Sequence, residues 1–164
     1  MKCPKSAQRR LPRNSAASAK PSTSAQPVGG VRVGANPLAK LDLESGELAM
    51  MTIRTHDQFN TTVYGMHDRY RGIHNERRVI LMHADDIRER GLKAGVVVDL
   101  TGHFEGEVRH APRFVVVEYD VPRGCCATYF PETNVLVPLD STAERSGTPT
   151  SKYVRITVAR TEII

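Results

Sequence analysis

The 164-residue sequence lacks tryptophan, has three cysteines, and carries no acidic residue in its first forty positions. No run of about 18 apolar residues occurs, so no membrane-spanning helix is predicted. No apolar segment follows the basic start, which argues against a secretory signal. Cys3, Cys125 and Cys126 are too few and too poorly spaced for a disulfide framework or a zinc knuckle. We therefore expect a reducing, cytoplasmic location.

Charge is distributed unevenly along the chain. Residues 1–40 carry 8 basic side chains and no acidic one, whereas residues 41–164 carry 15 basic and 18 acidic side chains. The sequence pI of about 9.3 is therefore a property of the first segment. Nucleic-acid binding needs a basic face on a folded surface, with aromatic side chains beside it. A nucleic-acid partner is therefore not expected for the folded part.

The first segment also holds half of the prolines, among serine, alanine and glycine. Such a mixture buries too little apolar surface to offset the entropy lost on ordering. We predict that residues 1–40 form a disordered basic tail, and that residues 45–160 form the folded domain. A transit peptide is an alternative for the tail, although its proline spacing disfavours an amphipathic helix. A plain linker and an arm for an acidic partner are further alternatives.

The remaining chain is long enough for a single domain with one modest core. A short helix is predicted over residues 84–91, with Asp85 and Asp86 at its positive end and Gly91 as its terminator. A loop without regular pattern, and therefore of functional interest, is predicted over residues 122–151. Apolar and β-branched runs predict strands at residues 48–53, 96–101, 114–119 and 153–158, and residues 79–82 form a short apolar run that leads into the predicted helix. Several short strands with one short helix favour a small β-barrel.

A strongly polar segment follows the first predicted strand directly. Residues 52–62 offer a guanidinium, an imidazole, two carboxamides and four hydroxyls. Binding groups concentrate at strand-to-loop junctions, because the strand aims them and the loop can vary. The segment therefore predicts a site for a polar ligand.

Four blocks in fixed order identify a family resemblance: residues 52–62 (TIRTHDQFNTT), 84–95, 122–134 (PRGCCATYFPETN) and 148–152 (TPTSK). Together they resemble the C-terminal molybdopterin-dinucleotide-binding domain of the dimethyl sulfoxide reductase family, and most closely its formate-dehydrogenase-like branch. The resemblance covers about residues 45 to 160. It implies a mainly β fold, namely a six-stranded double-psi β-barrel with one or two short helices. It also implies a molybdopterin guanine dinucleotide as cofactor.

The resemblance implies a set of cofactor-binding residues, which are Arg54, Thr55, Gln58, Asn60, Thr61, Tyr129, Phe130, Asn134 and Lys152. These residue types suit such a ligand. Arg54 and Lys152 can supply charge-assisted donors to a pyrophosphate. A carboxamide such as Gln58 or Asn134 matches the donor and acceptor edges of a pterin, and an aromatic ring can rest on its face.

The 164 residues lack two regions that the family's enzymes use. In these enzymes a Cys, selenocysteine or Ser of another domain holds the metal, and an N-terminal four-cysteine motif often holds an iron–sulfur cluster. The resemblance therefore implies a separate or truncated module that is not catalytic alone. Its expected partners are the remaining domains or the large subunit of a molybdopterin oxidoreductase. A further departure is Val96, which stands where an Asp usually follows the Lys-Ala-Gly turn.

Two rival interpretations belong to other classes. A stand-alone double-psi barrel enzyme of the aspartate decarboxylase kind needs a Gly-Ser pair for self-processing, and the sequence has no Gly-Ser dipeptide. In the other rival the basic tail is an arm that binds nucleic acid or an acidic partner, and the barrel is only the scaffold that carries it.

Several polar groups also have simpler interpretations. His56 and Asp57 leave a strand in opposite directions, so they are not predicted to act as a catalytic pair. Cys125 and Cys126 have no partner at metal-ligand spacing. The segment 68–71 is predicted to form an ion-pair cluster at the surface.

Overall fold

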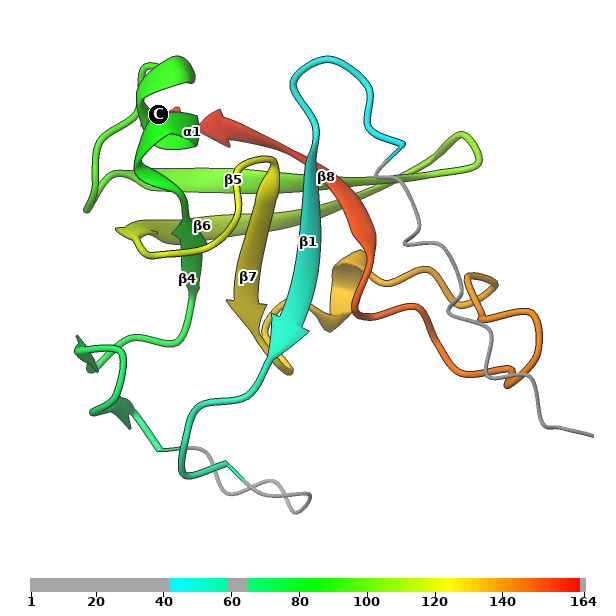
Figure 1. Cartoon of the computed structure of the whole chain (residues 1–164), viewed down its shortest axis with the longest axis horizontal. Coiled ribbons are helices and arrows are strands. Elements are labelled where there is room, and N and C mark those ends of the chain that lie inside the picture. Colours follow the sequence, from blue (N-terminus) through cyan, green and yellow to red (C-terminus); the bar gives the residue numbers. More distant parts are fainter. Residues whose placement is uncertain (1–41, 59–64, 163–164) are drawn as a thin grey trace, which may run out of the picture. The chain divides into compact units, whose positions relative to one another are not determined.

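The computed structural model of the protein describes residues 42–58 and 65–162, so the predicted tail lies outside the described residues. The described elements follow one another along the chain (Figure 1). They are β1 (Leu48–Ile53), β2 (His67–Asp68), β3 (Ile73–His74), β4 (Val79–Met82), α1 (Ala84–Glu89), β5 (Val97–Phe104), β6 (Glu107–Glu118), β7 (Cys125–Tyr129), the 3-10 turn η1 (Asn134–Leu136) and β8 (Val154–Arg160).

Within the described ranges, six strands close into a barrel in the order β1-β7-β4-β6-β5-β8 (Figure 1). Strand β1 runs parallel to β7 and β4 runs parallel to β6, while the other neighbours are antiparallel. Closure removes the unpaired sheet edges that an open sheet would present. The prediction of a mainly β, six-stranded double-psi barrel with a short helix is confirmed.

Strand β7 is the main difference from the predicted secondary structure. The sequence predicted an irregular loop over residues 122–151, and this is wrong at Cys125–Tyr129. Four of these five residues are buried, because β7 is covered on both faces. A strand covered on both faces shows no polar–apolar alternation, and this run is too short and too mixed to mark a strand otherwise.

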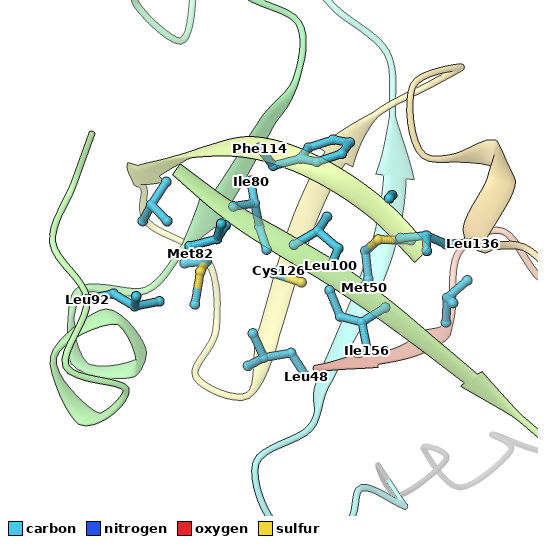
Figure 2. Close-up of a cluster of buried hydrophobic side chains, with 14 of the residues drawn as sticks. Leu48, Met50, Ile80, Met82, Leu92, Leu100, Phe114, Cys126, Leu136 and Ile156 are labelled. Carbon is cyan, nitrogen blue, oxygen red and sulfur yellow. The ribbon is translucent and has the colours of Figure 1, made fainter. Parts of the chain in front are cut away.

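The barrel interior is filled by large aliphatic side chains and one phenylalanine (Figure 2). Phe114, Leu100, Ile80 and Ile156 come from four different strands and are completely buried. Burying a side chain of this size contributes about 1.5–3 kcal/mol. The alternating burial of β5 and β8 places Leu100 and Ile156 inside.

A second apolar cluster covers the outer side of β4 and β7. It contains Val79, Leu81, Ala127 and Tyr129, which alternate along the two strands with residues that face the barrel interior. Ile73 from β3 also belongs to this cluster. Strand β4 is therefore buried on both faces, which explains its uninterrupted apolar sequence.

Cys126 lies within the barrel core, whereas Cys125 is partly exposed. Burial, with a smaller contribution from the adjacent Cys125, raises the pKa of the Cys126 thiol far above its ordinary value. Because the thiolate is the reactive form, we expect Cys126 to be alkylated at least about 10-fold more slowly than Cys125 in the native protein. Peptide mapping by mass spectrometry after timed alkylation measures both rates. Equal labelling of the two thiols before denaturation would contradict this expectation.

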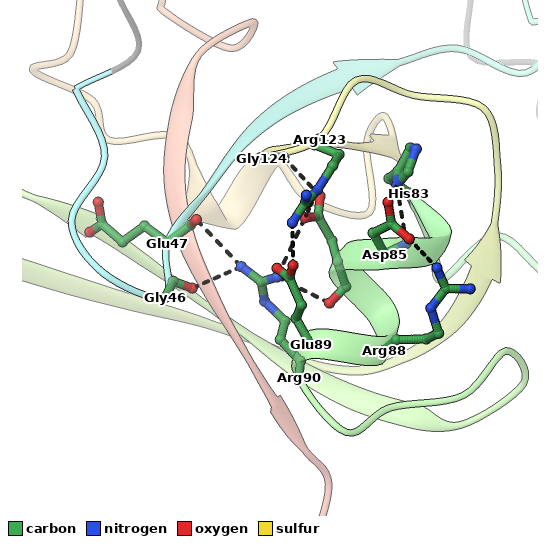
Figure 3. A network of polar contacts seen from close by, with 10 residues as sticks. Gly46, Glu47, His83, Asp85, Arg88, Glu89, Arg90, Arg123 and Gly124 are labelled. Carbon is green, nitrogen blue, oxygen red and sulfur yellow. Dashed lines mark hydrogen bonds and ion pairs between the residues drawn. The ribbon is translucent and has the colours of Figure 1, made fainter.

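Helix α1 ties together segments that are distant in sequence (Figure 3). Its N-terminus is capped by His83, whose Nδ1 accepts a hydrogen bond from the Asp85 amide at 3.1 Å. The Asp86 carboxylate accepts from the Gly124 amide at 2.8 Å, at the start of β7. Arg90 donates to the Gly46 carbonyl at 3.2 Å, just before β1. The helix thus fixes the starts of the parallel strands β1 and β7 side by side.

The turn before β5 is bonded through its backbone. Gly95 donates to the Val116 carbonyl at 2.7 Å, and Val116 donates to the Val96 carbonyl at 2.9 Å. These bonds to β6 hold the turn although Val96 replaces the acidic residue usual in the resembled family.

Among residues 42–58 and 65–162, no helix is long and apolar enough to cross a membrane.

Candidate functional site

The candidate site lies where the parallel strands β1 and β7 end. Ile53 and Tyr129 are register partners, so the segments that follow them leave the barrel together. Phe130 donates its amide to the Ile53 carbonyl at 2.8 Å, which extends the pairing beyond the strands. Thr52 donates its amide to the Ser151 carbonyl at 2.9 Å. Three segments separated by up to a hundred residues therefore converge at one end of the barrel.

A cavity of about 360 Å³ opens at this end. It is lined by Phe130, Asn134, Val137, Pro138, Leu139, Thr148, Pro149 and Ser151. Its walls combine an aromatic ring and prolines with a carboxamide and two hydroxyls. Planar heteroaromatic groups favour this combination, because apolar faces hold the ring and the polar groups fix its orientation.

Two cations stand on the segments next to this cavity. Arg54 follows β1 directly and is exposed, and its carbonyl accepts a 3.4 Å hydrogen bond from Arg71. Lys152 follows Ser151 of the cavity wall and donates a hydrogen bond from Nζ to the Thr52 carbonyl. A lysine ammonium has three N–H donors, so this contact leaves others for a ligand. The positions suit the binding of an anion beside the cavity.

Arg77 lies beneath the site and is almost completely buried. Its Nε donates to Glu132 at 2.5 Å, and its Nη2 donates to the other carboxylate oxygen at 3.2 Å. The guanidinium also lies 5.5 Å from the centroid of the Tyr129 ring. This bidentate pair joins the segment before β4 to the turn after β7.

The same guanidinium reaches the loop after β1. In that loop it donates to Gln58 Oε1 at 3.2 Å and to Thr55 Oγ1 at 3.5 Å. It also donates to the carbonyl of Phe130, after β7, at 2.9 Å. Gln58 in turn donates to the Phe130 carbonyl at 3.1 Å. Arg77 also donates to the Gly65 carbonyl at 3.1 Å. The guanidinium therefore bonds to residues on both sides of the segment 59–64.

A second buried ion pair supports the neighbouring hairpin of β2 and β3. Asp68 Oδ2 accepts from Arg71 at 2.5 Å and from the Tyr129 hydroxyl at 2.8 Å. Burial alone would raise the pKa of Asp68, but the hydrogen bonds from Arg71 and Tyr129 outweigh it and lower the pKa. Burial and the bond to Asp68 raise the pKa of Tyr129. The prediction of an ion-pair cluster at the surface is wrong for Asp68, which is buried.

The structure places the predicted ligand residues in two layers. Arg54, Phe130, Asn134 and Lys152 lie at the accessible end of the barrel, and two of them line the cavity. Thr55, Gln58 and Tyr129 are buried and bonded to Arg77 or Asp68. The predicted residues Asn60 and Thr61 lie outside the described residues.

His56 and Asp57 have separate partners in the structure. The His56 ring packs on Tyr70 at 3.8 Å between centroids, whereas Asp57 contacts Arg69 at 3.9 Å.

Sequence reasoning did not single out Arg77 or Glu132. Arg77 stands in a run of three charged residues, Glu76 to Arg78, which is typical of a solvated surface. The one available signal was its position two residues before the buried strand β4.

The donors present fit a ligand that carries both a pyrophosphate and a fused heterocycle. The cavity has an aromatic face, a carboxamide and hydroxyls, and Lys152 follows Ser151 of its wall directly. Arg54 is a second exposed cation, on the segment that leaves β1. Charge-assisted donors suit phosphate oxygens, and a carboxamide can pair with a heterocycle edge.

Comparison with known proteins agrees with this chemistry. The family model described as "Molydopterin dinucleotide binding domain" matches residues 48–155. An uncharacterized oxidoreductase of Mycobacterium tuberculosis is 47% identical over 124 residues, which make up 73% of this chain and 16% of that protein. An uncharacterized oxidoreductase of Mycobacterium bovis matches to the same extent. Protein YdeP of Escherichia coli is 38% identical over 115 residues, which cover 68% of this chain and 15% of YdeP. The chain thus spans about a sixth of the length of the relatives it matches.

Proposed function

Because this chain belongs to the molybdopterin dinucleotide-binding domain family, we propose that it is the guanine-dinucleotide-binding module of a molybdenum oxidoreductase. When bound, the cofactor's molybdenum would supply two-electron chemistry, on a small substrate such as formate in the formate-dehydrogenase-like branch. The metal-ligating residues would belong to the remaining part of such an enzyme. This module's own work is to bind and orient the cofactor.

Each accessible residue has a proposed role in binding. Arg54 and Lys152 neutralise the pyrophosphate, Asn134 pairs with a heterocycle edge, and Phe130 carries a ring face. Thr55, Gln58 and Tyr129 support these residues without being accessible themselves, because their side chains are buried and bonded to Arg77 or Asp68. The observation that supports the proposal most strongly is the convergence of Arg54, the Phe130–Asn134 turn and Lys152 at the ends of β1 and β7.

Binding of guanosine diphosphate to the full chain tests the proposal. This probe carries the guanine and pyrophosphate groups, and isothermal titration calorimetry should show saturable binding. Lys152→Met should weaken the affinity about 10-fold, since a charge-assisted hydrogen bond contributes roughly 1.5–3 kcal/mol. Lys93→Met is a matched control, because Lys93 is an exposed lysine in the turn before β5.

Two results would contradict the proposal. One is the absence of saturable binding by the unchanged chain. The other is an equal loss of affinity in the Lys152 and Lys93 variants, which would indicate only general attraction of an anion to a cationic surface.

A further inference from the structure

The buried Arg77–Glu132 pair has a cost that its surroundings must offset. Removing two charges from water is expensive, and buried ion pairs often stabilise no more than well-packed apolar residues would. The Arg77 side chain is 7% exposed and that of Glu132 is 17% exposed. Stability alone therefore does not account for an arginine at this position.

The geometry of Arg77 indicates another role. A guanidinium offers five N–H donors in a rigid planar fork, whereas an ammonium offers a single point of charge. The fork of Arg77 reaches the turn after β7 through Glu132 and Phe130, and the loop after β1 through Thr55 and Gln58. No single backbone hydrogen bond could fix these two segments relative to each other in this way.

We propose that Arg77 is a positioning residue for the dinucleotide pocket. It clasps the loop after β1, which begins with Arg54, to the turn that carries Phe130 and Asn134. Arg77 does not reach the cavity, whose lining residues do not include it. It acts through the residues it holds, and this inference rests on the proposed function only for the identity of the ligand.

Two variants separate positioning from structural support. Arg77→Lys keeps the charge opposite Glu132 but loses the fork that reaches Gln58, Thr55 and Phe130. The double variant Arg77→Met with Glu132→Leu replaces the pair by apolar side chains of similar size, which preserves folding in comparable cases. Arg78→Met is the matched control, because Arg78 is the exposed neighbour and donates to the Pro112 carbonyl instead.

Hydrogen exchange by mass spectrometry provides a readout that does not depend on the ligand. In both clasp variants we expect amide exchange at residues 55–58 and 130–134 to become about 10-fold faster, because local opening is no longer restrained. Exchange in the β5–β6 hairpin should be unchanged. Titration with guanosine diphosphate should show a loss of affinity of about 10-fold or more in both variants and none in the control.

The outcomes distinguish the two hypotheses. Unchanged exchange at residues 55–58 and 130–134 in Arg77→Lys would overturn the positioning role, whatever binds to the protein. Faster exchange together with undiminished nucleotide affinity would also overturn it. If the wild-type chain binds no nucleotide but the Arg77 variants show the faster local exchange, the proposed function is rejected and Arg77 is retained as the clasp of the two segments.

Discussion

Replacing Asp68 by asparagine is expected to lower the free energy of unfolding by about 2–3 kcal/mol near neutral pH. Removing one partner of a buried ion pair leaves the other uncompensated, and the Tyr129 hydroxyl loses a charged acceptor. The value lies below the usual range for fully buried pairs, because the Arg71 side chain is 24% exposed and water can reach it. Urea unfolding followed by circular dichroism measures the loss. Asp57→Asn is the control, since the Asp57 side chain is 57% exposed and its cation is 3.9 Å away.

The same substitution should change how stability depends on pH. The folded state lowers the pKa of Asp68 below the ordinary value of 3.8, so folding favours the carboxylate. Its contribution is complete above that value and disappears as the pH falls through the lower pKa of the folded state. Asp68→Asn should therefore lose less stability than the wild type on acidification from about pH 5 to about pH 2. If the free energies of unfolding of the two proteins fell by equal amounts between about pH 5 and about pH 2, Asp68 would not be a source of acid sensitivity.

Replacing Leu136 by alanine is expected to destabilise the protein by about 2–5 kcal/mol. Leu136 lies in η1, is completely buried and belongs to the barrel core. The turn comes this close because β5 carries Gly102, where an added β-carbon would lie 3.3 Å from the Leu136 carbonyl oxygen. Truncation therefore leaves a cavity and releases the turn that begins with Asn134.

Val135 provides the matched control for this prediction. It is the neighbouring aliphatic residue in the same turn and is 50% exposed, so Val135→Ala should cost less than about 1 kcal/mol. Thermal unfolding should show the larger loss of stability in Leu136→Ala. Nucleotide titration should also show a lower affinity in Leu136→Ala than in Val135→Ala. Similar stability losses in the two variants would show that η1 is not anchored through Leu136.

The fold was largely predictable because local patterns are strong in most of its elements. The half-buried strand β8 alternates visibly, and α1 begins at Ala84 as predicted and ends at Glu89, two residues before the predicted terminator Gly91. Strand β7 was not predictable in this way, because it is buried on both sides and its sequence has no period. Its presence depends on β1 and β4, which supply its hydrogen bonds from far away in the chain.

The sequence indicated the accessible residues of the candidate site but not the buried ones. Arg54, Phe130, Asn134 and Lys152 belong to sequence blocks that indicated a ligand, and their segments adjoin the ends of β1 and β7, while their role in binding stays a prediction. Arg77 and Asp68 look like ordinary surface charges in sequence, because burial of a charged residue depends on partners that lie elsewhere in the chain. Nothing local marks Glu132, 55 positions away, as the partner of Arg77.

Strand β1 has consequences for the order in which the protein matures. Its neighbours are β7 on one side and β8 on the other, and Leu48 pairs with Ile156. Pairings between such remote segments form slowly and cannot form on the ribosome until the later strand has emerged. Strand β1 therefore completes its pairing only after β8 has been synthesised, and the bond from Thr52 to Ser151 at its pocket end waits for the segment just before β8. The nucleotide binding that we propose would accordingly follow the synthesis of β8.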